Sequence, residues 1–529
     1  MQIRSYSSLD FALAWRRTLK WAQGGQRDLR DRLPFETMAR IFKAAGPPLP
    51  KSTFHIAPVT LVIGSKKSGT SRPFARISPV DTLLYQALVD RLAADIEAAL
   101  APRDVVFAYR QNLDGDDDAF AGAPTREDYE REAREMLESF EHGHGYAVTA
   151  DIAGHFLHVD IDELERLLYE VSNESDVVRD LAALLRGWEA LGIRGLPQGV
   201  RPSSPLGNLY LAPLDRLLLA NEVRYVRWMD DFIIAAPSFH EARRIQDEVE
   251  RHLYEYGLSL AADKTRIVRW DVAIEGTERA QTHLDRVKAN HRREARAWID
   301  EALGWTDYPP TQDQLPDPKT LDREAVLNEY NKLLETLDAD ELPPRIGSTL
   351  VAIFRDLQSL KLAHRLHQLP LLLMRVPDVS AVALDYLVTV AKQDIAAATA
   401  VYEELLSSTH FMRDFEKLAM CESVLHLPER SALPLAAPLG RWALDDSHPL
   451  VRARALLAWG AQSPVSDFSI VDSFWLTAPP AWRPYALVAI KGKSKPARDR
   501  RLERWSSDGR FLGRLAHLIR TSGMAWRKL

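Results

Sequence analysis

The sequence predicts an α+β fold for its first half, followed by an all-α region. Short runs rich in β-branched and aromatic residues alternate with amphipathic helical patterns up to about residue 272. A Pro-rich stretch at Asp307–Lys319 (DYPPTQDQLPDPK) then precedes an almost continuous series of helical segments. With 529 residues, 46% hydrophobic and 27% charged, the chain has the size and composition of two or three globular domains.

Composition limits the compartment and the partners. The single cysteine, Cys421, excludes an internal disulfide, and its apolar surroundings predict a core position in a reducing, cytoplasmic protein. We expect no membrane partner, because no apolar stretch reaches spanning length and the N-terminus is polar. The net charge of −6 argues weakly against nucleic acid. However, Lys491–Leu529 carries twelve Lys/Arg against three acids, which suits either phosphate backbones or a solvated terminal helix.

The first hundred residues predict helices around one extended segment. Apolar spacing predicts a helix within Leu9–Ala45, a second at Pro34–Lys43, and a strongly amphipathic helix at Asp81–Leu100. Between them, Leu49–Ile77 has an extended pattern and contains a Gly-bearing turn flanked by cations. These cations suit a triphosphate, although a solvated basic loop is equally common; they are Lys66, Lys67, Arg72 and Arg76.

Two predicted strand segments bring acids to their ends. Tyr146–Asp151 (YAVTAD) is a short strand that ends in an acid, which could also be a core residue or a helix cap. Val223–Ala236 (VRYVRWMDDFIIAA) predicts a hairpin with Asp230 and Asp231 at its turn, and alone it could be a solvated turn. Loose alternation places three residues on one face of this hairpin: Val223, Tyr225 and Arg227.

Helices and one loop connect these strands. Helical patterns cover Asp160–Val171, Leu206–Leu219 and His240–Tyr256. The tetrapeptide LPQG at Leu196–Gly199 opens the loop before the second of these helices. A strand-like run, LSLAADKTRIV, follows the third helix and contains Lys264.

This order of elements resembles the palm of the reverse transcriptases, specifically the bacterial enzymes related to those of group II introns and retrons. The resemblance covers about Leu61–Val268. The one departure is Trp228, where the family usually has Tyr or Phe, and a larger aromatic still fills that role. Four motifs carry the resemblance in the expected order: Asp151-Ile152 with Phe156, Leu196-Pro197-Gln198-Gly199, Trp228-Met229-Asp230-Asp231, and Tyr256-Gly257-Leu258 through Lys264-Thr265.

The resemblance implies a right-hand polymerase with fingers and palm, which uses two Mg²⁺ or Mn²⁺ ions, deoxynucleotides and nucleic acid. It implies that Phe156 is a steric gate against ribose 2′-hydroxyls, although core packing also explains this residue. Lys264 would act near the pyrophosphate, against the alternative of a surface lysine. The implied catalytic residues are Asp151, Asp230 and Asp231; the metal ligands are Asp151, Ile152, Asp230 and Asp231; the dNTP contacts are Lys66, Lys67, Arg72, Phe156, Gln198, Gly199 and Lys264.

The carboxylate cluster can also be argued from sheet geometry. If the strand that ends at Asp151 lies beside the hairpin, a strand spacing of about 4.8 Å brings the three carboxylates together. Hard divalent cations prefer such oxygen ligands, and a pair of them can activate a 3′-hydroxyl and neutralise leaving pyrophosphate. Asp151 and Asp230 are the first ligands. Asp231 is a weaker candidate, because adjacent strand residues point in opposite directions.

The sequence predicts four segments: N-terminal helices and fingers at 1–145, the palm at 146–272, a connecting helix and linker at 273–320, and a helical repeat domain with a basic C-terminus at 321–529. One unit, ALDDSHPLVRARALLAWGA, resembles a HEAT-type repeat, which must stack on neighbours to bury its apolar face. The predicted helices are Glu275–Leu303, Arg355–Leu373, Ser380–Val390, Ile395–Leu406, Asp414–Leu425 and Arg452–Ala461.

A polymerase core joined to helical repeats resembles the stand-alone bacterial enzymes of abortive infection and antiphage defence. That resemblance implies DNA synthesis, template-independent and protein-primed in some members, together with homo-oligomers and a phage-derived trigger. Two alternatives remain: an ordinary templated reverse transcriptase of a mobile element, and a non-catalytic scaffold that binds nucleic acid. A scaffold has no need of a repulsive acid cluster, which favours an enzyme.

Overall fold

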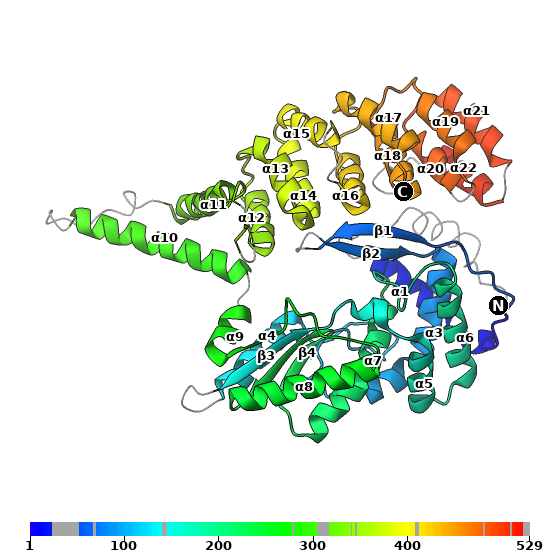
Figure 1. Ribbon diagram of the computed structural model, residues 1–529. Coiled ribbons are helices and arrows are strands. Elements are labelled where there is room, and N and C mark those ends of the chain that lie inside the picture. Colours follow the sequence, from blue (N-terminus) through cyan, green and yellow to red (C-terminus); the bar gives the residue numbers. More distant parts are fainter. Residues whose placement is uncertain are drawn as a thin grey trace. The chain divides into compact units, whose positions relative to one another are not determined.

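The computed structural model divides the chain into two compact units (Figure 1). The first unit comprises Met1–Val62 and Pro73–Glu278, and the second comprises Ile63–Arg72 and Arg279–Leu529. The end of one β-hairpin therefore belongs to the second unit. The structure describes residues 1–23, 52–66, 70–139, 145–277, 280–303, 317–339, 341–343, 346–407, 412–479, 482–507 and 510–521.

A four-stranded antiparallel sheet lies at the centre of the first unit. Its strand order is β4-β5-β3-β6, so β3 lies between β5 and β6 although it comes first in the chain. The register pairs Tyr146 with Ala236 and Asp151 with Asp231, which aligns the end of β3 with the start of β5. The strands are β3 (Tyr146–Asp151), β4 (Tyr225–Trp228), β5 (Asp231–Ala236) and β6 (Arg266–Arg269).

Both faces of this sheet are covered, because alternate residues of each strand enter different cores. Val148 and Ile234 belong to a large core that includes α8 (Phe239–Glu255), whose helix lies along the sheet in Figure 1. Ala147 and Ile233 belong to a smaller core with α4 (Arg126–Glu138) and α9 (Trp270–Thr277) on the other face. The sheet edge that carries the acids is thus held between two packed layers.

The other helices of the first unit surround this sheet. The helix predicted at Asp81–Leu100 is α3, and most of its first half is buried, so it is a core helix and not a surface one. Helices α4 and α6 are not among the predicted elements. The described helices are α1 (Phe11–Gln23), α3 (Pro79–Ala99), α4 (Arg126–Glu138), α5 (Ile161–Val171), α6 (Ser175–Glu189), α7 (Ser203–Ala220), α8 and α9 (Trp270–Thr277), with the short 3₁₀ helix η3 at His155–His158.

The second unit is helical apart from the hairpin end, within the residues that the structure describes. The hairpin consists of β1 (Thr60–Ser65) and β2 (Ser71–Arg76), which form a two-stranded sheet. The described helices of the second unit are α10 (Ala280–Leu303), α11 (Pro318–Glu335), α12 (Ile346–Ser359), α13 (Leu369–Arg375), α14 (Ser380–Ala391), α15 (Ile395–Ser407), α16 (Asp414–Leu425), α17 (Ala436–Asp445), α18 (Pro449–Gln462), α19 (Ser469–Thr477), α20 (Arg483–Ala489), α21 (Lys495–Ser506) and α22 (Arg510–Thr521).

One helix prediction in this unit is wrong. The sequence predicts a single helix at Arg355–Leu373, but α12 ends at Ser359 and α13 begins at Leu369. Lys361 and Arg365 adopt positive φ angles of 53° and 44°, which interrupt a right-handed helix. Apolar residues continue across this break, and that continuity is why the sequence pattern does not reveal it.

Other predictions have mixed outcomes. Cys421 is fully buried, which confirms a core position, and burial raises the pKa of its thiol. Among the described residues, no helix is both long and apolar enough to cross a membrane. Three predictions lie wholly or largely outside the described residues: the helix at Pro34–Lys43, the contact at Lys67 and most of the Pro-rich linker.

Candidate active site

The β4–β5 hairpin turns through two residues, Met229 and Asp230. Trp228 and Asp231 pair across the strands and close the turn. Met229 has φ +57°, a left-handed conformation that a two-residue hairpin turn requires and that a non-glycine residue adopts at a cost. The side chain of Met229 is buried, so the strained residue is anchored from within the fold.

The structure brings the three predicted carboxylates together at this turn. Asp151 and Asp231 are direct cross-strand partners, and the backbone N–H of Ile152 donates to the carbonyl oxygen of Asp230 at 3.3 Å. Two cationic side chains contact the cluster: Lys264 Nζ lies 2.8 Å from Asp151 Oδ2, and Arg126 Nη1 lies 3.1 Å from Asp231 Oδ2. Residues remote in sequence thus share one site.

The electrostatics of the cluster show that its negative charge is only partly compensated. Burial, followed by the charges of Asp151 and Asp231, raises the pKa of Asp230 to about 6. Burial also raises the pKa of Asp151, against the opposing hydrogen bond and charge of Lys264. Partial burial would lower the pKa of Lys264, but Asp151 outweighs it and the pKa is raised. Carboxyl groups whose pKa is raised by burial and by neighbouring acids are typical of a functional site.

A buried ion pair contacts the turn through a backbone carbonyl group. Arg227 is 0% exposed and forms two hydrogen bonds to Asp215, at 3.0 Å from Nε and 2.5 Å from Nη2. Its Nη1 donates to the carbonyl of Met229 at 2.8 Å and to Asn208 Oδ1 at 2.9 Å. Tyr225 also donates to Asp215, at 2.9 Å, which confirms that Tyr225 and Arg227 lie on one face of the hairpin.

Phe156 and the LPQG loop form a second cluster in the first unit. The N–H of Leu196 donates to the carbonyl of Phe156 at 2.8 Å, which joins η3 to the loop. The N–H of Ala75 on β2 donates to the carbonyl of Gln198 at 3.0 Å. Phe156 is half-buried, packs against the larger core and lies close to Gly207 at the start of α7. Its ring thus has a packing role and keeps an exposed part.

Gly199 is required by its backbone conformation and by its neighbour. Its φ is +85°, and a Cβ there would lie 3.2 Å from the ring of Phe74. A side chain would therefore be strained twice, once by the left-handed backbone and once by the aromatic ring. Beside this loop lies a hollow of about 300 Å³, lined mainly by apolar residues such as Leu157, Leu196, Pro73 and Ala75, together with Gln198.

The remaining predicted contacts lie on the hairpin end. Lys66 and Arg72 are part of Ile63–Arg72, which belongs to the second unit, and Arg72 is exposed. Lys67 lies outside the described residues. The roles of all three cations toward a triphosphate stay predictions.

The carboxylate cluster has the ligand types of a metal site, but its side chains are not arranged to coordinate an ion. Among the described residues, no group of three or more His, Cys, Asp or Glu side chains is arranged to hold a metal ion as it stands. Asp151 and Asp231 each direct an oxygen to a cationic side chain, Lys264 or Arg126. The donor set consists of carboxylate oxygens with unbalanced charge, which fits a hard divalent cation.

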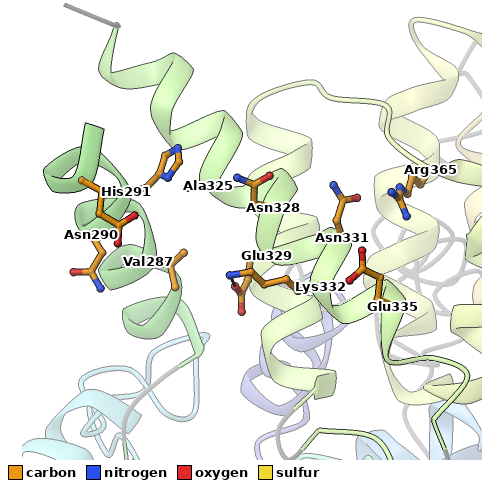
Figure 2. Close-up of a pocket in the computed structure, with 11 residues that line it drawn as sticks. Val287, Asn290, His291, Ala325, Asn328, Glu329, Asn331, Lys332, Glu335 and Arg365 are labelled. Atoms are coloured by element: carbon orange, nitrogen blue, oxygen red, sulfur yellow. Dashed lines mark ion pairs between the residues drawn. The ribbon is translucent and has the colours of Figure 1, made fainter. Parts of the chain in front are cut away.

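A larger hollow, of about 690 Å³, lies in the second unit between α10 and α11 (Figure 2). Most of its lining residues are polar or charged, and Lys332 Nζ lies 3.7 Å from Glu329 Oε2 on α11. His291 on α10 pairs with Glu324 at 3.5 Å. None of the predicted site residues lines this hollow, so it is a feature separate from the carboxylate cluster.

Sequence reasoning missed the residues that support the site. Arg126 lies on α4, a helix that was not predicted, and its guanidinium covers the rings of Tyr129 and Trp228 at 4.6 and 5.4 Å from their centroids. Trp228 therefore packs in an aromatic layer behind the turn. Asp215 looks like an ordinary acid in an apolar helix, and the isolated acid within LYLAPLDRLLL was the one available signal.

Comparison with known proteins finds one similar family. Residues 65–295, which include the carboxylates and Lys264, match the family model described as reverse transcriptase (RNA-dependent DNA polymerase). A search of curated proteins finds no match. Among solved structures, telomerase from Candida albicans in complex with a TWJ fragment of telomeric RNA is similar at 12% identity, with a TM-score of 0.30. That match covers 67% of this chain and 63% of the telomerase chain, less than two thirds of its length. Residues 65–295 of the chain are thus similar to the reverse transcriptase (RNA-dependent DNA polymerase) family.

Proposed function

We propose that the protein is a DNA polymerase that adds deoxynucleotides to a 3′-hydroxyl at the Asp151–Asp230–Asp231 cluster. The observation that carries the proposal is the convergence of three carboxylates, from the end of β3, the β4–β5 turn and the start of β5, with the pKa of Asp230 raised to about 6. Such a cluster disfavours folding by its own repulsion, and it becomes useful when it binds cations. The family match to residues 65–295 supports the same class of reaction.

The residues that would hold Mg²⁺ or Mn²⁺ are Asp151, Asp230, Asp231 and the backbone of Ile152. When bound, such ions activate the attacking hydroxyl and neutralise charge on the leaving pyrophosphate. In this proposal Lys264 moves from Asp151 toward the nucleotide phosphates and brings a positive charge to them, because a lysine side chain is protonated at neutral pH. Lys66, Lys67 and Arg72 bind the triphosphate. Gln198 and Gly199 contact the nucleotide or the template.

The proposal is tested with purified full-length protein and labelled dNTPs, in the presence of Mg²⁺ or Mn²⁺. Wild type should incorporate label, and Asp230→Ala combined with Asp231→Ala should not. Asp176→Ala, a change of an exposed acid on α6, is the matched control and should remain active. Equal incorporation by wild type and the double variant would refute the proposal.

The template and the biological role are finer proposals. By architecture alone, a polymerase domain followed by a helical unit with HEAT-like repeats supports antiphage defence as a cytoplasmic homo-oligomer with a phage-derived trigger. Incorporation without added RNA, and DNA that co-purifies with the protein, would support template-independent or protein-primed synthesis. Strict dependence on an RNA template would favour a mobile-element enzyme instead. Nucleic-acid binding without any incorporation would favour a scaffold.

Phe156→Ala should relax the choice of sugar. If the exposed part of the ring excludes a ribose 2′-hydroxyl, its removal should raise ribonucleotide over deoxynucleotide incorporation by about 10- to 200-fold, as for other small steric differences in a pocket. Competition between labelled rNTP and dNTP measures the ratio. Phe156→Leu keeps most of the bulk and serves as the control for lost packing. An unchanged ratio in Phe156→Ala would leave packing as the role of this residue.

Lys264→Met should tighten binding of Mn²⁺ while it slows synthesis. A cation that binds Asp151 must displace the ammonium group, which lies 2.8 Å away in a partly exposed pair. Such pairs contribute little, so we expect a decrease in the dissociation constant of roughly fivefold at most. Paramagnetic resonance of free Mn²⁺ measures this without any nucleotide. Lys319→Met, at an exposed position on α11, is the control, and weaker Mn²⁺ binding by Lys264→Met would contradict the competition.

A further inference from the structure

The end of the β1–β2 hairpin presents a free strand edge. The two strands form a sheet of their own, and Lys66 N–H donates to the carbonyl of Thr70 at 2.8 Å across the turn. Because backbone groups alternate along a strand, the N–H groups of Ile63 and Ser65 point to the opposite edge. An unpaired edge of this kind needs partners.

The first turn of α16 supplies those partners within the second unit. Asp414 Oδ2 accepts from the N–H of Ile63 at 3.1 Å, and Glu416 Oε1 accepts from the N–H of Ser65 at 3.3 Å. The two acids are two residues apart, as are the two N–H groups that they bind. Two carboxylates of one helix end thus match two successive free donors of one strand edge.

Arg413 binds backbone carbonyl groups of the same hairpin. Its Nη1 donates to the carbonyl of Thr70 at 2.7 Å and to that of Gly64 at 3.4 Å, so one guanidinium contacts both sides of the hairpin. Its own N–H donates to Glu416 Oε2 at 3.0 Å. Glu416 therefore binds the start of α16 with one oxygen and the hairpin with the other.

Glu416 is a buried group, with 3% of its surface exposed. Burial raises its pKa above the ordinary value, against the lowering effect of the hydrogen bonds that it accepts. A carboxylate is costly in such a place unless its oxygens are paired. The contact between α16 and the hairpin is therefore a specific interaction within the second unit and not an incidental contact of surface groups.

We propose that Arg413, Asp414 and Glu416 are positioning residues for deoxynucleotide binding. These hydrogen bonds reach backbone atoms of the hairpin, and Glu416 also bonds the side chain of Ser65, so they do not use the side chains of Lys66 and Arg72. The helical unit thereby fixes the strand segment whose cations contact the incoming triphosphate. This role rests on the proposed polymerase function and adds to it a dependence of substrate affinity on the helical unit.

Hydrogen exchange tests the contact without any need for activity. In full-length Glu416→Ala, which removes both acceptor oxygens, peptides that cover β1 should exchange roughly tenfold faster than in wild type, the order expected for loss of one hydrogen bond. Arg413→Ala should have the same effect at the turn. Arg441→Ala, at an exposed position on α17, should leave β1 unchanged. Unaltered exchange of β1 in both test variants would overturn the proposal.

Kinetics test the positioning role. Arg413→Ala should raise KM for dNTP about tenfold with kcat changed less than about twofold, since loose cations bind substrate less well in ground and transition states alike. Arg413→Lys, which can reach one carbonyl but not both, should recover part of the affinity. Faster exchange of β1 with an unchanged KM would overturn this inference alone. A wild type that incorporates no dNTP would overturn the proposed function, and this role with it.

Discussion

Replacing Asp230 with asparagine should abolish nucleotide incorporation and make the cation-free protein more stable above pH 6. The side chain keeps its size and loses its charge. Incorporation should fall by at least the order of 10²- to 10³-fold that follows loss of one electrostatic group at a transition state. A gain in stability at a residue that function requires distinguishes a binding site from a structural one.

The sign of the stability effect follows from proton linkage. The pKa of Asp230 is raised from 3.8 to about 6 by burial and by the charges of Asp151 and Asp231. The folded protein therefore binds this proton more tightly than the unfolded chain. The corresponding stability is fully present below about pH 4 and is lost as the pH rises through about 6. Replacement by asparagine removes this pH-dependent loss of stability, which amounts to roughly 1–3 kcal/mol in the free energy of unfolding at pH 7.5.

The two compact units need not unfold together, so the measurement must report on the sheet itself. Denaturant-dependent hydrogen exchange of peptides from β3 and β5, in EDTA at pH 5 and pH 7.5, meets this requirement. The variant should differ from wild type at pH 7.5 and much less at pH 5. Asp176→Asn is the control at an exposed acid. Weaker protection of β3 in Asp230→Asn at pH 7.5 would show that the aspartate serves the fold.

The same pKa predicts how divalent ions bind. Metal ligands must be deprotonated, so affinity for Mn²⁺ should decrease as the pH falls through about 6, where Asp230 takes up its proton. Calorimetric titration of wild type with Mn²⁺ between pH 5 and pH 8 measures this decrease. In Asp230→Asn the pH dependence in this window should largely disappear. A wild-type affinity that stays constant from pH 8 to pH 5 would contradict the assignment of Asp230 as a ligand.

The β4–β5 hairpin could be predicted from the sequence because its signals are local. The β-branched and aromatic runs on both sides of Asp230 and Asp231 specify two strands and a turn. The pairing of Asp151 with Asp231 was expected only in outline, because register depends on how β3 fits between β5 and β6. The strand-end position of Asp151 was the local signal that made this inference worthwhile.

The supporting residues could not be predicted, since their roles arise from tertiary contacts. Arg126 approaches Asp231 from a helix about a hundred residues away, and Arg413 contacts a hairpin about 350 residues away. On sequence alone, Arg413 and Glu416 are the charged start of an ordinary helix. Arg227 was placed on the correct face, but nothing local indicates that this face is closed to water there.

Arg227→Met should produce the largest loss of stability of any change near the site. It would leave Asp215, 1% exposed, as a buried and unpaired charge. Removal of one partner of a buried ion pair destabilises by about 3–5 kcal/mol. Incorporation should also fall, because the Met229 carbonyl loses its 2.8 Å donor and the turn that carries Asp230 is no longer fixed. Arg224→Met, an exposed change beside the same hairpin, should have little effect on either measure.

A second variant separates these two effects. Arg227→Met combined with Asp215→Asn contains no buried charge, and the introduced amide oxygen can still accept the hydroxyl of Tyr225, so most of the lost stability should return. The Met229 carbonyl still lacks the guanidinium donor, and kcat should therefore remain reduced by about 10- to 100-fold, equivalent to roughly 1.4–2.7 kcal/mol of lost positioning. Protection of β4 and β5 and kcat at saturating dNTP measure the two quantities. If kcat recovered in step with stability, the role of Arg227 would be limited to stabilising the fold. If stability recovered without kcat, the buried pair would be the element that holds Asp230 in its reactive position.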